Sequence, residues 1–324
     1  MFGLEGIIPT GFMWLIFGAI IFGLLAIDLF VFNRNPHEIK TKEALWTSVF
    51  WIGISLLFNV FVFIERGPTA GLEFFTGYLI EKALSVDNIF VFVVIFAYFQ
   101  VPQKYQHRVL FLGILGALLL RGTLIFVGAA LIERFEWVIY VFGAFLIFTA
   151  YRLGTQGDEG VHPDKNPIVK LVRRVMPVTS DFIGQSFLTR IDGVLWATPL
   201  LVVLLVIETT DVVFALDSIP AIFAITTDPF IVFTSNVFAI LGLRALYFLL
   251  AGVMSSFRYL KTGLSFILGF VGVKMLVGIF HIEIPILVSL GVIVVVLAVS
   301  IIASIIAQRR EERALALLHE SNES

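Results

Sequence analysis

The stretch Glu208-Thr-Thr-Asp211-Val-Val-Phe-Ala-Leu-Asp217-Ser-Ile-Pro220 places three carboxylates and a proline inside an apolar run of about residues 194–226. A charged side chain at the centre of a bilayer costs about 3 kcal/mol on insertion scales, and helix packing does not require three of them. A second stretch, Glu81-Lys-Ala-Leu-Ser-Val-Asp87-Asn88, lies inside another apolar run, about residues 72–99. We therefore expect the rest of the chain to be a scaffold that holds these two stretches against each other.

The composition of the chain predicts a polytopic membrane protein. Its 324 residues are 59% hydrophobic and 14% charged, and the mean hydropathy is +1.01, whereas soluble domains are about half apolar and about a quarter charged. The sequence contains no cysteine, which excludes disulfides, thiolate metal ligands and cysteine nucleophiles. We expect the lipid bilayer to surround the chain, and we expect neither a nucleic-acid partner nor an organic cofactor.

Apolar runs long enough to cross a bilayer, for which about 20 residues suffice, recur along the whole chain. The nine runs cover about residues 11–32, 44–64, 72–99, 107–131, 136–152, 194–226, 229–253, 259–280 and 284–307. The predicted fold class is therefore an all-α polytopic membrane protein of about nine transmembrane helices, with residues 1–324 in a single membrane domain. The two acidic runs are longer than a straight crossing needs, which indicates tilted or interrupted helices.

The positions of Lys and Arg predict the orientation of the chain in the membrane. The connections after the first, third, fifth and seventh runs, with the C-terminal tail, hold 16 of the 22 basic residues, whereas the N-terminus and the other connections hold 2. Cytosolic loops are enriched in Lys and Arg. We therefore predict a multi-pass protein of the cell membrane with its N-terminus outside. Residues 153–193 are then a cytosolic connecting loop with room for a short interfacial helix, and residues 308–324 are a cytosolic tail.

An internal repeat surrounds the acidic stretches. Glu81-x5-Asp87-Asn88-Ile89 matches Asp211-x5-Asp217-Ser218-Ile219, and in the next helices Ile114-Leu-Gly116 matches Ile240-Leu-Gly242. A competing register instead aligns Glu81 with Glu208, so the exact alignment stays open.

In either register the repeated unit is three helices, about residues 72–152 and about residues 194–280. An odd number of helices must place the second copy in the opposite orientation across the membrane. Inverted repeats of this kind are typical of secondary transporters, whose binding sites lie near the midplane where the repeats meet. The repeat therefore predicts a transport site between the runs 72–99 and 194–226.

Oxygen-bearing side chains of the two acidic stretches are the candidate metal ligands. They are Glu81, Asp87, Asn88, Glu208, Asp211 and Asp217. The five His residues (His37, His107, His162, His281 and His319) are expected in loops or in the tail. A site of oxygen ligands suits hard cations such as Mn²⁺, Mg²⁺ or Ca²⁺ and disfavours Zn²⁺ or Cu.

The direction of Asp217 depends on the proline that follows it. On an unbroken helix Asp217 would point away from Glu208. Pro220 cannot donate a hydrogen bond to the carbonyl of Leu216, and it disfavours helical geometry at Ile219. We therefore predict a local unwinding at Pro220 that turns Asp217 toward the site and frees a backbone oxygen.

The buried charges allow two interpretations. Asp28 and the five acids of the two stretches give six negative charges, and Lys82, Arg121, Arg244 and Lys274 give four positive ones. The formal remainder of −2 is compatible with a divalent cation. Alternatively, the charges pair with one another as structural bridges, as intramembrane charges often do. We favour structural pairing for Arg121 and Arg244 and a transport role for the acids of the two stretches, and for Asp28 both roles remain open.

The sequence resembles the TerC family of integral membrane proteins, most closely its manganese-exporting, Alx-like branch. The segments that carry the resemblance are residues 77–91, 208–224, 226–232 and 236–251, and the likeness extends from about residue 12 to 305. The resemblance implies efflux of Mn²⁺ from the cytosol. It also implies a metal-site role for Glu81, Asp87, Glu208, Asp211 and Asp217.

The expected function is therefore transport without catalysis, with Mn²⁺ as the exported ion. Protons are a candidate counter-ion, because carboxylates can take up H⁺ when the metal leaves. Two alternatives stay open, namely export of another cation such as Ca²⁺, and a factor that assists the assembly of other membrane proteins. The sequence shows no His-Glu-x-x-His motif that would indicate a membrane hydrolase.

Overall fold

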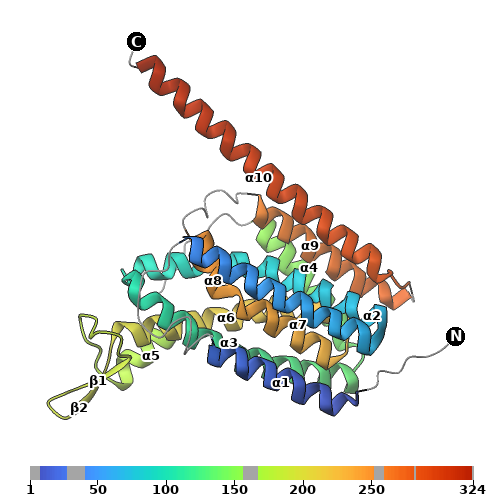
Figure 1. Cartoon of the computed structure of the whole chain (residues 1–324), viewed down its shortest axis with the longest axis horizontal. Helices are drawn as coiled ribbons and strands as arrows, with labels where there is room; N and C mark the ends of the chain where they lie inside the picture. Colours follow the sequence, from blue (N-terminus) through green and yellow to red (C-terminus); the bar gives the residue numbers. More distant parts are fainter. Residues whose placement is uncertain (1–7, 28–40, 156–166, 252–258, 281, 323–324) are drawn as a thin grey trace.

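The computed structural model describes residues 8–27, 41–155, 167–251, 259–280 and 282–322, which are almost entirely helical (Figure 1). The α-helices are α1 (Thr10–Ile27), α2 (Thr41–Tyr98), α3 (Gln103–Arg134), α4 (Val138–Thr155), α5 (Pro167–Val175), α6 (Pro199–Phe223), α7 (Pro229–Leu241), α8 (Leu243–Leu250), α9 (Leu260–Val277) and α10 (Ile286–Asn322). A 3₁₀ turn (Gly278–Phe280) follows α9, and two short strands, β1 (Leu188–Ile191) and β2 (Val194–Ala197), precede α6.

Eight helical segments in the described part of the chain are long and apolar enough to cross a membrane, with α7 and α8 counted as one segment. One of them, α2, bends at Gly67, where φ is 88° and ψ is 174°. Glycine tolerates this backbone conformation, and Pro68 begins the second half, where its missing N–H is not needed. The two halves, residues 41–66 and 68–98, each exceed the length of about 20 residues that a crossing needs. The predicted all-α membrane fold with about nine crossings is therefore confirmed.

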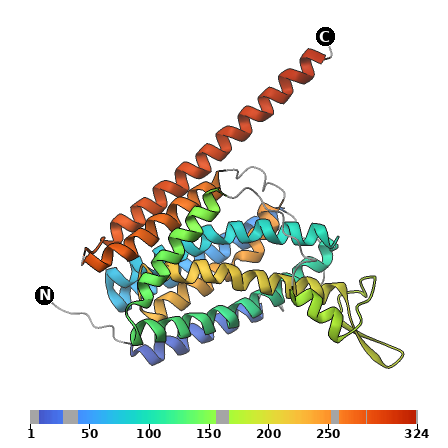
Figure 2. The same cartoon turned by 180° about the vertical axis from the view of Figure 1, so that it is seen from behind.

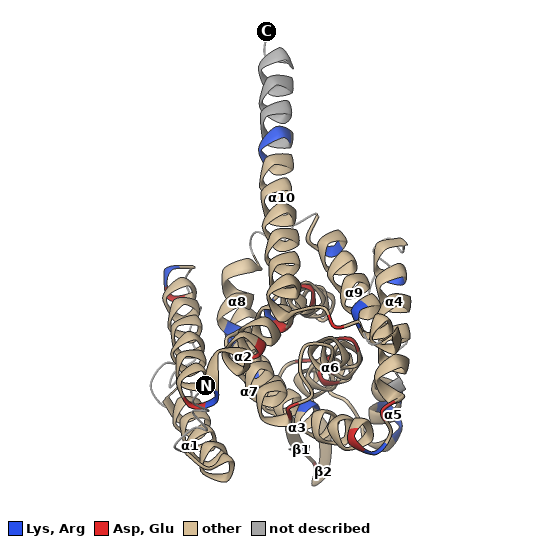
Figure 3. Ribbon diagram, turned by 90° about the vertical axis from the view of Figure 1, so that its right-hand side faces the viewer, with Lys and Arg blue, Asp and Glu red and all other residues tan. Residues whose placement is uncertain are grey.

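Helix α6, which carries the most acidic stretch, lies in the interior of the bundle. Seen along the long axis of the molecule, it is surrounded by other helices (Figure 3), and it contacts α2, α3, α4, α7 and α9. Its acidic side chains are therefore held among helices. Helix α10 packs against α9 and α2 and then projects beyond the bundle (Figures 1 and 2).

The contacts between helices have the symmetry expected of two three-helix units. Helix α4 packs against α9, α3 against α6, and α2 against α7 and α8, so exchanging the units maps these contacts onto one another. In α3, Gly116 lies against the carboxylate of Glu208, and Gly242, between α7 and α8, lies against the ammonium of Lys82. In the register that pairs Gly116 with Gly242, these contacts make Lys82 and Glu208 equivalent positions, which differs from both alignments of the acidic stretches.

An aromatic cluster fixes α7 against α1 and α2. The rings of Phe58 and Phe238 lie 4.6 Å apart between centroids, and Phe17, Phe74 and Phe230 pack around them. Aromatic pairs at such distances add about 1 kcal/mol beyond their buried area. This packing turns the face of α7 that carries the buried residue Asn236 toward α2.

The segment 153–193, predicted to be a connecting loop, contains α5 and the first strand of a β-hairpin. Strands β1 and β2 pair antiparallel, with Ile191 opposite Val194. Both turn residues, Asp192 and Gly193, have positive φ angles of 51° and 80°, as the tightest hairpin turns require. The start of the predicted run 194–226 is therefore a strand, and the helix begins at Pro199. The hairpin and α5 lie at the end of the bundle opposite to the N-terminus (Figures 1 and 2).

The predicted unwinding at Pro220 is wrong, because α6 continues through this residue to Phe223. A proline inside a helix removes only one backbone hydrogen bond and introduces one steric clash. Here Ile219, Pro220, Ala221 and Ile222 are all buried, so packing on every side offsets that loss. Consequently Asp217 keeps the direction that an unbroken helix gives it.

Candidate functional site

Arg121 of α3 joins the two acidic stretches. Its side chain is 2% exposed, and its Nε and Nη2 donate to the two carboxylate oxygens of Asp211 at 3.0 and 2.8 Å. Its Nη1 donates to Oε1 of Glu81 and, at 3.0 Å, to Oγ of Ser218. The guanidinium therefore bridges α2 and α6 through charge-assisted hydrogen bonds, which are about twice as strong as neutral ones.

Two polar side chains complete this group. Asn236 of α7 donates from Nδ2 to Oε2 of Glu81 at 2.9 Å, and its Oδ1 is buried without a hydrogen-bond partner. Ser85, one turn after Glu81 in α2, is also buried, and its Oγ has no partner. We call the six residues the central cluster: Glu81, Ser85, Arg121, Asp211, Ser218 and Asn236.

Glu208 lies next to the central cluster, one turn before Asp211 in α6. Its carboxylate rests over Gly116 of α3, where an added Cβ would collide with it. Its Oε2 is buried and makes no hydrogen bond, and its charge interacts with that of Asp211. Glu208 therefore adds a third carboxylate, beside the two that Arg121 binds. The formal charge of Glu81, Asp211, Glu208 and Arg121 together is −2.

The ammonium of Lys82 binds a backbone oxygen and lies near an aromatic ring. Its Nζ donates to the backbone oxygen of Ala239 at 3.0 Å and lies 5.8 Å from the centre of the Tyr78 ring. Its charge still acts on Glu81, the preceding residue in the chain. Lys82 therefore offsets part of the negative charge without making a hydrogen bond to a carboxylate in the described structure.

Two of the remaining predicted ligands, Asp217 and Asp87, interact with each other on another side of α6. Oδ1 of Asp217 accepts a hydrogen bond from Thr149 of α4 at 2.9 Å, and Asp217 interacts electrostatically with Asp87 and Arg152. Asn88 is buried in α2, 2% exposed. The structure thus brings Glu81 and Asp211 together on Arg121, with Glu208 beside them, and places Asp217 with Asp87.

No group of three or more His, Cys, Asp or Glu side chains among the described residues is arranged as a metal site. The guanidinium of Arg121 occupies the space between Glu81 and Asp211 instead. The structural pairing expected for Arg121 is confirmed. Asp28 lies outside the described residues.

His107, expected in a loop, lies in α3, where its Nε2 is 3.1 Å from Nη1 of Arg244. That contact gives Arg244 a polar partner at the end of α3 nearest the hairpin. It also explains why this histidine does not take part in the acidic group, since its ring is directed toward α8.

Sequence reasoning missed Asn236 and Thr149. Asn236 belongs to a segment that carries the family resemblance, but nothing in its spacing links it to Glu81, which lies in another unit of the repeat. Thr149 gives no signal, because threonines that bond their own helix backbone are common in this chain, as at Thr76 and Thr234. Only the packing of the helices shows these two contacts.

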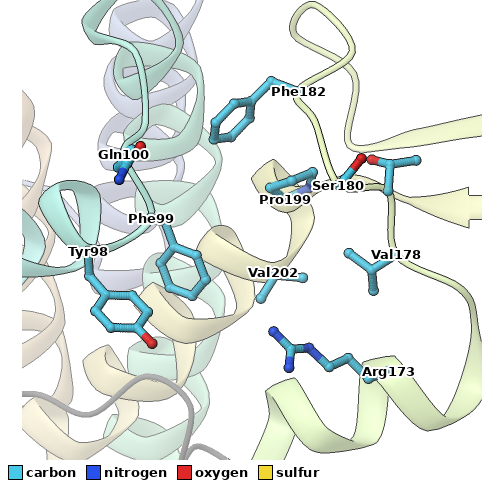
Figure 4. A pocket seen from close by; sticks show the side chains of 10 residues that line it. Tyr98, Phe99, Gln100, Arg173, Val178, Ser180, Phe182, Pro199 and Val202 are labelled. Carbon is cyan, nitrogen blue, oxygen red and sulfur yellow. The ribbon is translucent and has the colours of Figure 1, made fainter.

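Two cavities in the described part of the chain differ in size and lining. A small cavity of about 10 Å³ touches Arg121 and Asp211 and is otherwise lined by apolar side chains such as Phe92 and Leu110, a volume at the lower limit for one water molecule. A larger cavity of about 560 Å³ lies near the hairpin (Figure 4). Among the described residues its lining includes Arg173 and Ser180 but no Asp or Glu, so its chemistry does not suit a cation.

Comparisons with known proteins agree with this architecture. The family model described as "Integral membrane protein TerC family" matches residues 66–312. An uncharacterized membrane protein of Myxococcus xanthus is 54% identical over 92% of this chain and 93% of its own length. The protein named "Putative membrane-bound redox modulator Alx" in Escherichia coli (strain K12) is 45% identical over 94% of this chain and 98% of its own.

No solved structure matches the chain. The family match includes every residue of the central cluster and Glu208, and the relatives align over nearly the whole sequence. Because of this family match and these similar relatives, the chain belongs to the integral membrane protein TerC family.

Proposed function

We propose that this chain exports hard divalent cations, with Mn²⁺ as the main substrate, from the cytosol. The observation that carries the proposal is the excess of negative charge around Arg121. Glu81 and Asp211 are buried and share one guanidinium, and Glu208 beside them has a buried oxygen without a partner. Buried charges that are left uncompensated are unfavourable, so the group favours an additional cation.

The donor atoms of this group determine which cations fit. Carboxylate oxygens, the amide of Asn236 and the hydroxyl of Ser85 are hard ligands, which suit Mn²⁺, Mg²⁺ and Ca²⁺ better than Zn²⁺. Asp87 and Asp217, which interact with each other, offer further oxygens for a second position on the path. Carboxylates released by the ion can take up protons, which makes H⁺ the proposed counter-ion.

The names of several relatives describe a redox modulator. The composition of this chain limits how that description can apply to it. It contains no cysteine, so it has no thiol for disulfide exchange. Transport of a redox-active metal ion provides a different connection to cellular redox state, because Mn²⁺ export changes the supply of that metal.

Flux measurements in proteoliposomes test the proposal. Purified wild-type protein should carry Mn²⁺ across the vesicle membrane and bind Mn²⁺ in preference to Zn²⁺. Glu208→Gln should reduce the flux at least tenfold, because the substitution removes one of the negative charges that attract the ion. The protein should remain folded, because Oε2 of Glu208 makes no hydrogen bond that the substitution would break. Glu133→Gln, which changes an exposed carboxylate near the end of α3, is the matched control and should leave the flux unchanged.

The alternatives give different results in the same vesicles. Faster flux of Ca²⁺ than of Mn²⁺ would change the substrate but keep the mechanism. Absence of metal flux from folded wild-type protein would contradict the proposal and favour the role of an assembly factor.

A further inference from the structure

Arg121 is bound as a cation in a substrate site would be bound. Three of its nitrogens donate to both oxygens of Asp211, to Glu81 and to Ser218. These partners come from α2 and α6, the two helices that carry the acidic stretches. The guanidinium is thus the cation that holds these helices together in the described structure.

The surroundings of Arg121 differ from those of a purely structural bridge. In a completed bridge, buried polar atoms have hydrogen-bond partners, as most do in folded proteins. Here three buried oxygens on or beside the central cluster have none: Oγ of Ser85, Oε2 of Glu208 and Oδ1 of Asn236. They come from three different helices, and each is an atom that a hard cation binds.

The formal charges indicate what is missing. Glu81, Asp211 and Glu208 carry three negative charges, and Arg121 carries one positive charge. One divalent cation would make the group neutral without any proton uptake. Lys82, whose charge acts on Glu81, offsets part of the remaining negative charge, so the hard oxygen ligands, together with the charge, favour a divalent ion.

From these observations we infer that Arg121 is a tethered cation that competes with the transported divalent ion for Glu81 and Asp211. This inference rests on the proposed function. In the empty protein the guanidinium neutralises the two acids and holds α2 against α6. An entering ion takes over the carboxylates, and Ser85 and Asn236 supply neutral oxygens. The return of Arg121 to the carboxylates then displaces the ion, so the ion is released and is not trapped.

The competition predicts that metal binding tightens when the side chain at residue 121 holds the carboxylates less strongly or carries no charge. Four proteins are compared: wild type, Arg121→Lys, Arg121→Gln and Arg121→Gln/Glu81→Gln. Binding of Mn²⁺ is measured by calorimetry, and melting temperature is measured with and without Mn²⁺. Lysine keeps the charge but cannot form the two-pronged contact with Asp211.

We expect Arg121→Gln to bind Mn²⁺ at least tenfold more tightly than wild type, which is about 1.4 kcal/mol. Its melting temperature should be low without Mn²⁺ and should rise with Mn²⁺ by more than that of wild type. Arg121→Lys should bind a few-fold more tightly than wild type. Transport by Arg121→Gln should nevertheless fall, because release becomes slow. In the double variant the charge is rebalanced and a ligand is lost, so the gain in affinity should disappear.

The outcomes separate the inference from the proposed function. If wild type binds and transports Mn²⁺ but both Arg121 variants bind it equally or less tightly, the inference is wrong and the transport function stands. If wild type neither binds nor transports the ion, the proposed function itself fails. Should Arg121→Gln not fold even with Mn²⁺, the affinity of Arg121→Lys decides the question.

Discussion

Asp211 and Asp217 both lie in α6, yet they meet different helices. Asp211 faces Arg121 of α3, and Asp217 faces Thr149 of α4. A helix of 3.6 residues per turn separates their directions by about a third of a turn. Because α3 and α4 pack on different sides of α6, the two acids contact different helices. Neighbouring acids in one motif can therefore have separate roles.

A matched pair of variants tests the role of Asp217. Asp217→Asn keeps an oxygen that can accept the hydrogen bond from Thr149, so we expect a normal amount of folded protein but at least a tenfold loss of Mn²⁺ flux. Thr149→Val removes that hydrogen bond, at a cost of about 1 kcal/mol, and keeps the carboxylate, so flux should persist. Loss of flux in Thr149→Val together with normal flux in Asp217→Asn would assign Asp217 a structural role.

The acids of this site could be found from the sequence, but their partners could not. Glu81 and Asp211 stand out because a charge inside a long apolar run is costly. Arg121 stands out for the same reason, but the sequence does not show which carboxylate it meets. That depends on the contact of α3 with α2 and α6, and apolar residues that face lipid or another helix look alike in a sequence. The contact of Asn236 with Glu81 likewise depends on helix packing, so the sequence does not predict it.

The longest helix is interrupted, and the interruption depends on a single backbone position. At Gly67 the chain leaves helical geometry, and Arg66 next to it forms an ion pair of 2.6 Å with Asp228. Asp228 also caps α7 by accepting hydrogen bonds from the N–H groups of Phe230 and Ile231. The bend in α2 is thereby tied to the start of the helix that carries Asn236.

Pro220 and the hairpin show where local sequence rules succeed and fail. The rule that a proline interrupts a helix failed in α6, where the surrounding residues are buried and packing dominates. The turn Asp192-Gly193 is a hairpin signal that the sequence does contain. The apolar run that begins at Val194 nevertheless favours a helix over a strand at these positions. Hydropathy alone does not locate the boundary between a strand and a helix inside an apolar run.

Two glycines of α2 provide a test of the bend. An alanine at Gly67 must adopt φ near 88°, a region almost restricted to glycine, so Gly67→Ala should lower the free energy of unfolding by about 1–3 kcal/mol. Gly53 has helical geometry in the first half of α2, and an added Cβ there meets no atom within 4 Å. Gly53→Ala should therefore raise stability by up to about 1 kcal/mol. Unfolding in mixed micelles measures both, and equal stabilities would show that the bend tolerates a side chain.

The molecule as a whole has two different ends. At one end lie the start of α1 and the connection between α3 and α4, and at the other lie α5 and the β-hairpin (Figures 1 and 2). The second end carries Lys170, Arg173, Arg174 and Arg190. Basic residues concentrate on the cytosolic side of membrane proteins, so this end is predicted to face the cytosol. The direction of the proposed metal export depends on that orientation.

Thiol labelling of intact cells tests this orientation directly, because the chain has no cysteine and every introduced one is the only thiol. Glu136→Cys lies between α3 and α4, Arg190→Cys lies in β1, and both positions are exposed. A reagent that cannot cross the membrane should label Glu136→Cys in whole cells and label Arg190→Cys only after the cells are opened. A reporter fused after Ser324 should likewise be cytosolic. The reverse labelling pattern would place the basic end outside, and the same flux would then be import.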